Sequence, residues 1–221
     1  MNDNQIELFK VVLLGESGVG KTSIISQFID NSFEEDLQSS TGGTFSTKSF
    51  VYGEGKILKF EIWDTAGQER YRALTKMFYK DANAAILVYD ITRKISYEEL
   101  KNYWVKQIKD NAPENIIVGI VANKSDLSEQ EEVNEEEARE FSKDLGAFFC
   151  SISAKNRFGI EDLFLKIAQI HVKTYQVKIK NDDEEIPNQG DEKEEQLNKN
   201  GTMKISKEKT INNKQKKKKC C

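Results

Sequence analysis

A glycine-rich loop is the strongest chemical signal in the sequence. It comprises Gly15-Glu16-Ser17-Gly18-Val19-Gly20-Lys21-Thr22, which fits the pattern G-x-x-x-x-G-K-[ST] between an apolar segment and a segment of helical period. Such a loop surrounds phosphate oxygens with backbone N–H groups at the start of a helix, while the lysine adds positive charge and the threonine can bind magnesium. The loop therefore predicts a nucleotide phosphate as ligand. A chance glycine-rich turn is the alternative, which the flanking segments disfavour.

Two further polar segments predict the base of that nucleotide. Asn123-Lys124-Ser125-Asp126 follows the fifth apolar strand candidate, and Ser153-Ala154-Lys155 follows the sixth, where α/β sheets place their ligands. The Asp126 carboxylate can accept hydrogen bonds from the N1–H and the 2-amino group of guanine, and adenine lacks both donors. Alone, Asn-Lys-Ser-Asp could be an ordinary turn. Together with the phosphate loop, it predicts guanine.

A third polar segment follows the third strand candidate and reads Asp64-Thr65-Ala66-Gly67-Gln68-Glu69-Arg70. We expect Asp64 beside the phosphate loop, where it can organise a magnesium shell. Gly67 permits close approach of its N–H to a terminal phosphate, and Gln68 can hold a water in line for attack. The same segment could also simply cap the next helix.

The elements that must position these residues alternate between short apolar runs and segments of helical period, which predicts an α/β fold. The expected strands are Leu8–Leu14, Ser46–Tyr52, Ile57–Trp63, Ala84–Tyr89, Ile116–Val121 and Ala147–Ile152. The expected helices are Lys21–Asp30, Gln68–Tyr79, Tyr97–Asp110, Glu135–Leu145 and a last helix from Ile160. Only four residues separate the second and third strands, so we expect an antiparallel edge pair in an otherwise parallel six-stranded sheet with helices on both faces.

Composition limits the other classes of function. The chain has 221 residues, 38% of them hydrophobic, and a net charge of −4, so it has enough apolar material for one core and no overall nucleic-acid signature. No run approaches the roughly 20 apolar residues that span a bilayer, and we expect a cytosolic protein with reduced cysteines. The only histidine, His171, is expected to pack or lie at the surface, which leaves no histidine-based catalysis or metal cluster.

The C-terminal segment differs from the rest of the chain. From about Asn181 the residues are acidic and then basic with few apolar side chains, which predicts disorder. Lys216 to Lys219 lead directly into Cys220 and Cys221. Taken alone, this ending could be a solvated lysine tail, a nuclear-localisation-like run or a weak metal site.

With these motifs assembled, the first 175 residues or so resemble the Ras superfamily of small GTPases. The stretches Lys59–Lys80 and Ala85–Thr92, together with the terminal Cys-Cys, resemble the Rab branch more than the Ras, Rho, Arf or Ran branches. The resemblance implies a P-loop small-GTPase fold with a GTPase domain over residues 1–175 and a mostly disordered tail over 176–221. In that family the terminal cysteines carry two geranylgeranyl groups, so the resemblance implies lipidation of Cys220 and Cys221.

The resemblance also assigns roles to residues that match the family motifs. Lys21 would contact the β- and γ-phosphates, Phe33 would stack on guanine unless it is a core residue, the Ala154 N–H would face the base, and Gln68 would position the water. The expected GTP-binding residues are Gly15, Glu16, Ser17, Gly18, Val19, Gly20, Lys21, Thr22, Ser23, Phe33, Ser40, Asp64, Gly67, Asn123, Lys124, Asp126, Ser153, Ala154 and Lys155. The expected magnesium ligands are Thr22, Ser40 and Asp64.

The first switch loop departs from the family pattern. A gapless match puts Ser40 where relatives carry the threonine that binds magnesium, and a one-residue gap would make Thr41 the ligand. Gly42-Gly43 also departs from the usual effector stretch, so this loop is expected to be mobile until GTP orders it. A degenerate GTP-binding module held in one nucleotide state is therefore an alternative, and a P-loop kinase or ATPase is a third.

The function that the resemblance implies is a Rab-type switch in vesicle trafficking. It would hydrolyse GTP to GDP and phosphate slowly, with Mg²⁺ as cofactor, and recruit effectors in the GTP state. The implied partners are an exchange factor, a GTPase-activating protein that supplies a missing positive charge, an escort protein and a dissociation inhibitor. The implied location is the cytoplasmic face of an intracellular membrane, in exchange with the cytosol, with endosomes as the favoured membrane.

Overall fold

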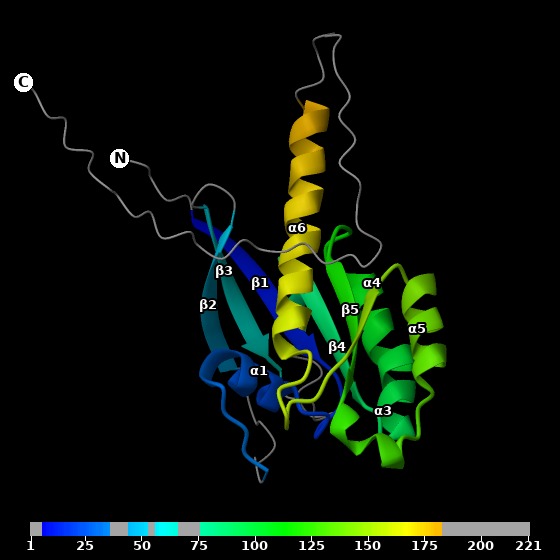
Figure 1. Cartoon of the computed structure of the whole chain (residues 1–221). Coiled ribbons are helices and arrows are strands. Elements are labelled where there is room, and N and C mark those ends of the chain that lie inside the picture. The colour runs from blue at the N-terminus through cyan, green and yellow to red at the C-terminus, as the bar shows by residue number, and fades with distance from the viewer. Residues whose placement is uncertain (1–5, 36–43, 53–55, 66–75, 183–221) are drawn as a thin grey trace, which may run out of the picture. The chain divides into compact units, whose positions relative to one another are not determined.

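The computed structural model describes residues 6–35, 44–52, 56–65 and 76–182 (Figure 1). The chain divides into two units, Met1–Asn181 and Asp182–Cys221, and nearly all of the second unit lies outside the described residues. The predicted lipidation residues Cys220 and Cys221, and the predicted disorder of the tail, therefore fall outside the described part of the chain. Within that part, no helix is long and apolar enough to cross a membrane.

The first unit is built on one six-stranded sheet, as predicted. Its strands follow the order β2-β3-β1-β4-β5-β6, and only the β2–β3 pair is antiparallel. The strands are β1 (Ile6–Leu14), β2 (Thr44–Tyr52), β3 (Lys56–Asp64), β4 (Ala84–Asp90), β5 (Ile117–Asn123) and β6 (Phe148–Ser151). The predicted α/β class and the antiparallel edge pair are thus confirmed.

Each expected helix has a counterpart in the structure, but the bounds and the regularity of some of them differ from the prediction. They are α1 (Lys21–Asp30), α2 (Lys76–Tyr79), α3 (Lys94–Glu99), α4 (Val105–Asn111), α5 (Glu135–Asp144) and α6 (Ile160–Asp182). The single helix expected over Tyr97–Asp110 begins earlier and contains a π-helical segment, Leu100–Trp104, between α3 and α4. A 3-10 helix over Ser125–Gln130 was not predicted. Of the helix expected over Gln68–Tyr79, only α2 lies within the described residues.

Two apolar clusters sandwich the sheet because side chains alternate between its faces. Phe9, Val11 and Leu13 of β1 join α1 and α6 in one cluster. Val12 and Leu14 join α3, α4 and α5 in the other. Figure 1 shows α6 crossing one face of the sheet. Helices therefore cover both faces of the sheet, as predicted.

The functional loops meet at one edge because five of the six strands run in the same direction. The loops after β1, β4, β5 and β6 all leave from carboxyl ends of parallel strands, and so does the segment after β3. In α/β sheets this edge is where ligands bind. The only histidine lies away from it, with Nε2 of His171 2.6 Å from Oε1 of Glu7 and its ring against Phe9.

Candidate functional site

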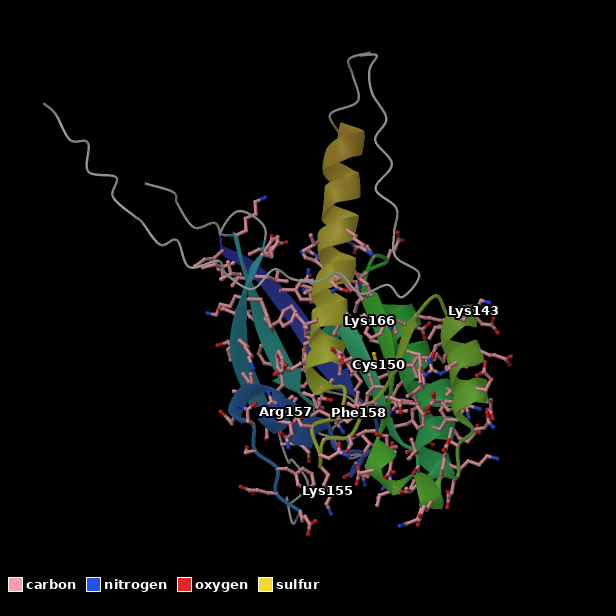
Figure 2. All side chains as sticks on the ribbon, viewed as in Figure 1. Lys143, Cys150, Lys155, Arg157, Phe158 and Lys166 are labelled. Carbon is pink, nitrogen blue, oxygen red and sulfur yellow. The ribbon has the colours of Figure 1, made fainter. Side chains whose placement is uncertain are left out.

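A cavity of 380 Å³ lies at the edge where these loops meet. Twelve of its lining residues were predicted from the sequence: Ser17, Gly18, Gly20, Lys21, Thr22, Ser23, Phe33, Asn123, Lys124, Asp126, Ala154 and Lys155. Four were not: Glu34, Glu35, Thr65 and Leu127. Lys155 marks this end of the molecule in Figure 2, whereas Lys143 and Lys166 lie toward the other end. The phosphate loop and both predicted base segments thus line one cavity.

The remaining predicted residues fall into two groups. Gly15, Glu16, Val19, Asp64 and Ser153 are described but do not line the cavity, and their atoms support the residues that do. Ser40, Gly67 and Gln68 lie outside the described residues, as does Thr41. The choice between Ser40 and Thr41 as a magnesium ligand therefore stays a prediction.

The carbonyl groups of the phosphate loop are held by side chains. Lys21 Nζ donates to the carbonyl oxygens of Gly15 and Glu16, at 2.9 Å each. Asn123 Nδ2 donates to the carbonyl oxygen of Val19 at 2.8 Å. In a trans peptide the C=O and the N–H point in opposite directions. Because the carbonyls are held, the directions of the N–H groups of the loop are fixed as well.

Two glycines are required by the close packing of this loop. Gly15 has a φ of 144°, and a Cβ there would lie 2.2 Å from the carbonyl oxygen of Val88. Gly20 has a φ of 94°, and a Cβ there would lie 2.3 Å from Asn123 Nδ2. A side chain at either position would push the loop away from β4 or from the Asn123 amide. The glycine spacing of the motif thus follows from contacts with β4 and β5.

The Lys21 ammonium is buried, and burial is the main reason that its pKa falls from 10.5 to about 8. The negative charges of Asp64 and Glu16 act in the opposite direction and raise this pKa, while the nearby Arg93 charge lowers it further. An anion beside Lys21 would stabilise the protonated form. The cavity is therefore an anion site whose lysine is sensitive to what binds next to it.

A hydroxyl and a carboxylate come together at the phosphate end of the cavity. Thr22 Oγ1 donates to Asp64 Oδ2 at 2.6 Å, although the two residues are 42 positions apart. The neighbouring Thr65 is also fixed, because its Oγ1 donates to the carbonyl oxygen of Leu13 at 2.6 Å. Oxygen donors of this kind suit Mg²⁺, which prefers oxygen ligands and retains several waters. Two of the three predicted magnesium ligands are thus adjacent.

The predicted base segments hold each other in place at the other end of the cavity. Ser153 Oγ donates to Asp126 Oδ1 at 2.5 Å. The Ala154 N–H donates to Asn123 Oδ1 at 3.1 Å, so the amide of Asn123 contacts both the phosphate loop and the segment after β6. Asp126 therefore presents a carboxylate of fixed orientation to the cavity, which suits a ligand with paired N–H donors.

Two lysines on this side of the cavity are paired with carboxylates. Lys124 Nζ lies 2.6 Å from Oδ2 of the buried Asp90. Lys155 Nζ lies 2.6 Å from Glu35 Oε1 at the surface, and this hydrogen bond lowers the pKa of Glu35 and raises that of Lys155. Phe33 is half-buried between the cavity and the apolar cluster of α1, so it both lines the site and packs.

Asp90 and Arg93 were not predicted from the sequence, although both contact residues that line the cavity. Asp90 pairs with Lys124, and Arg93 Nη2 donates to the carbonyl oxygen of Ser17 at 3.0 Å. Asp90 ends a parallel strand, so the rule that placed Asn123 would also have found it. Arg93 contacts a residue 76 positions away and belongs to no motif, so no local pattern indicates it.

Comparisons with known proteins agree with this geometry. A model of the Ras family matches residues 10–173. The chain is 45% identical over 160 residues to "Ras-related protein Rab-22A" of Homo sapiens, a match that covers 72% of this chain and 81% of that protein. It is 44% identical over 164 residues to "Ras-related protein Rab-31" of Rattus norvegicus, covering 74% and 83%. It is 43% identical over 166 residues to "Ras-related protein RABA1e" of Arabidopsis thaliana, covering 75% and 76%.

The lowered pKa of Lys21 predicts that binding of GDP, the nucleotide expected from the sequence, depends on pH. Phosphate favours protonated Lys21, so binding above pH 8 requires proton uptake, and affinity falls as pH rises. The protonated fraction of a lysine with a pKa of about 8 falls about tenfold between pH 7 and pH 9, and we expect the same fall in GDP affinity. Titration calorimetry across this range measures it. Lys21→Met should bind more weakly with a flat profile, and an equally steep profile in that variant would contradict the assignment.

Proposed function

Because the chain belongs to the Ras family and, within it, to the Rab small GTPases, we propose that its cavity holds GTP with the phosphates at Lys21 and the guanine at Asp126. As a Rab GTPase the protein binds GTP and GDP, hydrolyses GTP to GDP and phosphate, and acts in vesicle trafficking. The observation that carries the assignment of residues is that the phosphate loop and both base segments line one cavity.

Guanine recognition rests on the Asp126 carboxylate. Its orientation is fixed by the Ser153 hydroxyl, and the adjacent Asn123 amide and Ala154 N–H are fixed by each other. Guanine offers the N1–H and the 2-amino group to such a carboxylate, whereas adenine offers neither donor and would leave the charge without partners. Phe33 supplies an apolar face on the same cavity. These groups together favour guanine over adenine.

Replacement of Asp126 tests this assignment. We expect Asp126→Ala to weaken GTP binding about a hundredfold, because two hydrogen bonds to a charged acceptor are lost. In wild-type protein, ATP should fail to displace a fluorescent GDP at concentrations where GTP displaces it fully. Asp162→Ala is the matched control, since Asp162 is an exposed aspartate on the first turn of α6. Equal displacement by ATP and GTP would show that Asp126 does not select the base.

Magnesium is held in this proposal by the Thr22 hydroxyl and the Asp64 carboxylate, which already lie 2.6 Å apart. Ser40, or Thr41 if the loop is one residue shorter than in relatives, supplies the third protein oxygen. When bound, Mg²⁺ neutralises charge on the β- and γ-phosphates. Lys21 adds a positive charge on the same side, and the N–H groups of the phosphate loop add donors. The chain's own residues thus orient the phosphates and offset their charge.

Hydrolysis requires a water molecule that is positioned for attack, and we propose that Gln68 positions it. Phosphoryl transfer needs positioning and charge neutralisation rather than a covalent intermediate, so an amide that orients water is sufficient. No arginine is among the described residues that line the cavity. An activating protein that supplies this positive charge is therefore part of the proposal, together with an exchange factor.

Loss of the Gln68 amide should slow hydrolysis without weakening binding. We expect Gln68→Ala to lower the single-turnover rate of GTP cleavage by on the order of tenfold to a hundredfold, because the attacking water loses its orientation. Quench-flow or phosphate-release measurements give the rate, and fluorescent GTP gives the affinity. Glu69→Ala is the neighbouring control. If Gln68→Ala and Glu69→Ala cleave GTP at the same rate, the water is oriented by another group.

Effectors need a surface that senses the bound nucleotide. Phe45 of β2 is half exposed, its ring lies 5.1 Å from that of Trp63, and Trp63 lies 5.7 Å from Phe78. Exposed aromatic side chains of this kind are enriched at protein interfaces. Trp63 immediately precedes Asp64, one of the proposed magnesium ligands. We therefore assign effector binding to these three aromatic residues and the adjoining segments 36–43 and 66–75.

Membrane attachment in this proposal depends on Cys220 and Cys221. Two prenyl groups anchor a protein stably, and the lysines that precede them add attraction to anionic lipid. An escort protein and a dissociation inhibitor would allow exchange between the cytosol and the cytoplasmic face of an intracellular membrane, for which we favour endosomes. The basis for the prenylated tail is the Lys216–Lys219 run with the terminal Cys-Cys, together with membership of the Rab small GTPases.

Mass spectrometry of protein from its native cell tests the lipid assignment. We expect the membrane-bound fraction to carry two geranylgeranyl groups on the last two residues. The Cys220→Ser and Cys221→Ser double variant should be entirely cytosolic, because the remaining lysines bind anionic lipid weakly on their own. Unmodified cysteines in the membrane fraction would refute the assignment.

A further inference from the structure

The guanidinium of Arg93 lies against the phosphate loop. Its Nη2 donates to the carbonyl oxygen of Ser17 at 3.0 Å. Its Nη1 lies 3.3 Å from the position that a Cβ on Gly18 would take. Arg93 is not among the residues that line the cavity. It therefore contacts the loop that binds the ligand, and not the ligand.

The turn that carries Arg93 is firmly held. The backbone N–H of Arg93 donates to the carbonyl oxygen of Asp90 at 3.0 Å, and its own carbonyl oxygen accepts from the Ser96 hydroxyl at 2.7 Å. Asp90 Oδ1 accepts from both the N–H and the hydroxyl of Thr92, at 2.9 and 2.7 Å. A side chain whose backbone is held in this way needs less ordering to fix its partner. The contact with Ser17 is thus preorganised by β4 and α3.

The position of this contact fills a gap in the set of side chains that hold the loop. Lys21 binds the carbonyl oxygens of Gly15 and Glu16, and Asn123 binds that of Val19. The Ser17 carbonyl lies between these, and Arg93 binds it. Because the peptide is trans, a Ser17 carbonyl directed at Arg93 turns the N–H of Gly18 away from Arg93, and Gly18 itself lines the cavity.

We propose that Arg93 is a positioning residue for nucleotide binding, which orients the Gly18 N–H toward the phosphates and adds a second positive charge beside the loop. This inference rests on the proposed binding of GTP and GDP phosphates by the same loop. In this proposal the turn between β4 and α3, which lies outside the phosphate-loop motif, also takes part in nucleotide binding.

The charge of Arg93 supports this role. Among the described residues, no carboxylate lies within salt-bridge distance of its guanidinium, and its buried Nε has no hydrogen-bond partner. Its charge is near enough to Lys21 to act against protonation of that lysine and lower its pKa. Two cations that contact the same loop repel each other, and a polyanion bound to the loop attracts both. The phosphates of the nucleotide are such an anion.

Release of fluorescent GDP from the full-length protein tests the proposal. We expect Arg93→Met to release GDP about tenfold faster than wild type, which corresponds to about 1.4 kcal/mol. Arg93→Lys retains the charge but not the planar fork of donors, so we expect an intermediate rate. Lys94→Met is the matched control, because it removes the same charge from the next residue, which is exposed. It should release GDP within about twofold of wild type.

A phosphorus spectrum separates positioning from a general loss of stability. If Arg93 orients the loop, the ³¹P resonances of bound GDP should move in Arg93→Met and remain in place in Lys94→Met. Release rates that agree within twofold between Arg93→Met and Lys94→Met, or unchanged resonances in Arg93→Met, would overturn the inference. If Arg93→Met does not fold, the same comparison is made with Arg93→Lys. Failure of the wild-type protein to bind GDP would instead overturn the proposed function.

Discussion

The buried amide of Asn123 is the interaction on which the rest of the site depends. One end of it binds the Val19 carbonyl in the phosphate loop, and the other accepts the Ala154 N–H after β6. Three loops that are distant in sequence therefore share one side chain. An amide that is buried with both ends satisfied costs little, whereas losing one partner leaves a polar group buried at a cost of about 1–3 kcal/mol. The phosphate end and the base end of the cavity are consequently held as one unit.

The two ends of the cavity carry opposite charges. Lys21 and Arg93 both contact the phosphate loop, and the Asp126 carboxylate lies at the opposite end of the cavity, beside Ser153. Phosphates are attracted to the first end, and a base that carries N–H donors to the second. A nucleotide in the reverse orientation would place its phosphates against Asp126. The cavity thus selects the orientation of its ligand as well as its chemical type.

The sequence predicted those helices and strands that are determined by residues close to one another in the chain. The short connection between β2 and β3 indicated the antiparallel pair, and the apolar runs indicated the parallel strands. The π-helical segment Leu100–Trp104 was missed, since the buried residues around it, such as Leu100, Trp104 and Ile108, keep the spacing of an ordinary amphipathic helix. The 3-10 helix Ser125–Gln130 contains no buried residue, so apolar periodicity gives no signal for it.

The same distinction applies to the site. Residues of the phosphate loop and of the two base segments could be found because the spacing within each motif reflects contacts made by that segment. Asp90 and Arg93 act on partners that lie far away in sequence: the pairing of β4 with β5 brings Asp90 to Lys124, and the pairing of β4 with β1 brings Arg93 to Ser17. Their roles depend on the strand order of the sheet. A search for sequence motifs therefore does not find these residues. The rule that ligand-binding residues follow the carboxyl ends of parallel strands would nevertheless have identified Asp90.

The pairing of β2 with β3 explains how a change at the phosphates can reach a partner protein. Thr44, where β2 begins, is the register partner of Asp64, and Phe45 is the register partner of Trp63. Both segments assigned to effector binding, 36–43 and 66–75, therefore adjoin the same end of one antiparallel pair. Asp64 is bonded to Thr22 and Thr65 to Leu13, so this end is tied to the rigid part of the domain. A ligand that displaces either segment acts within a residue or two of Phe45 and Trp63, and no long path through the core is required.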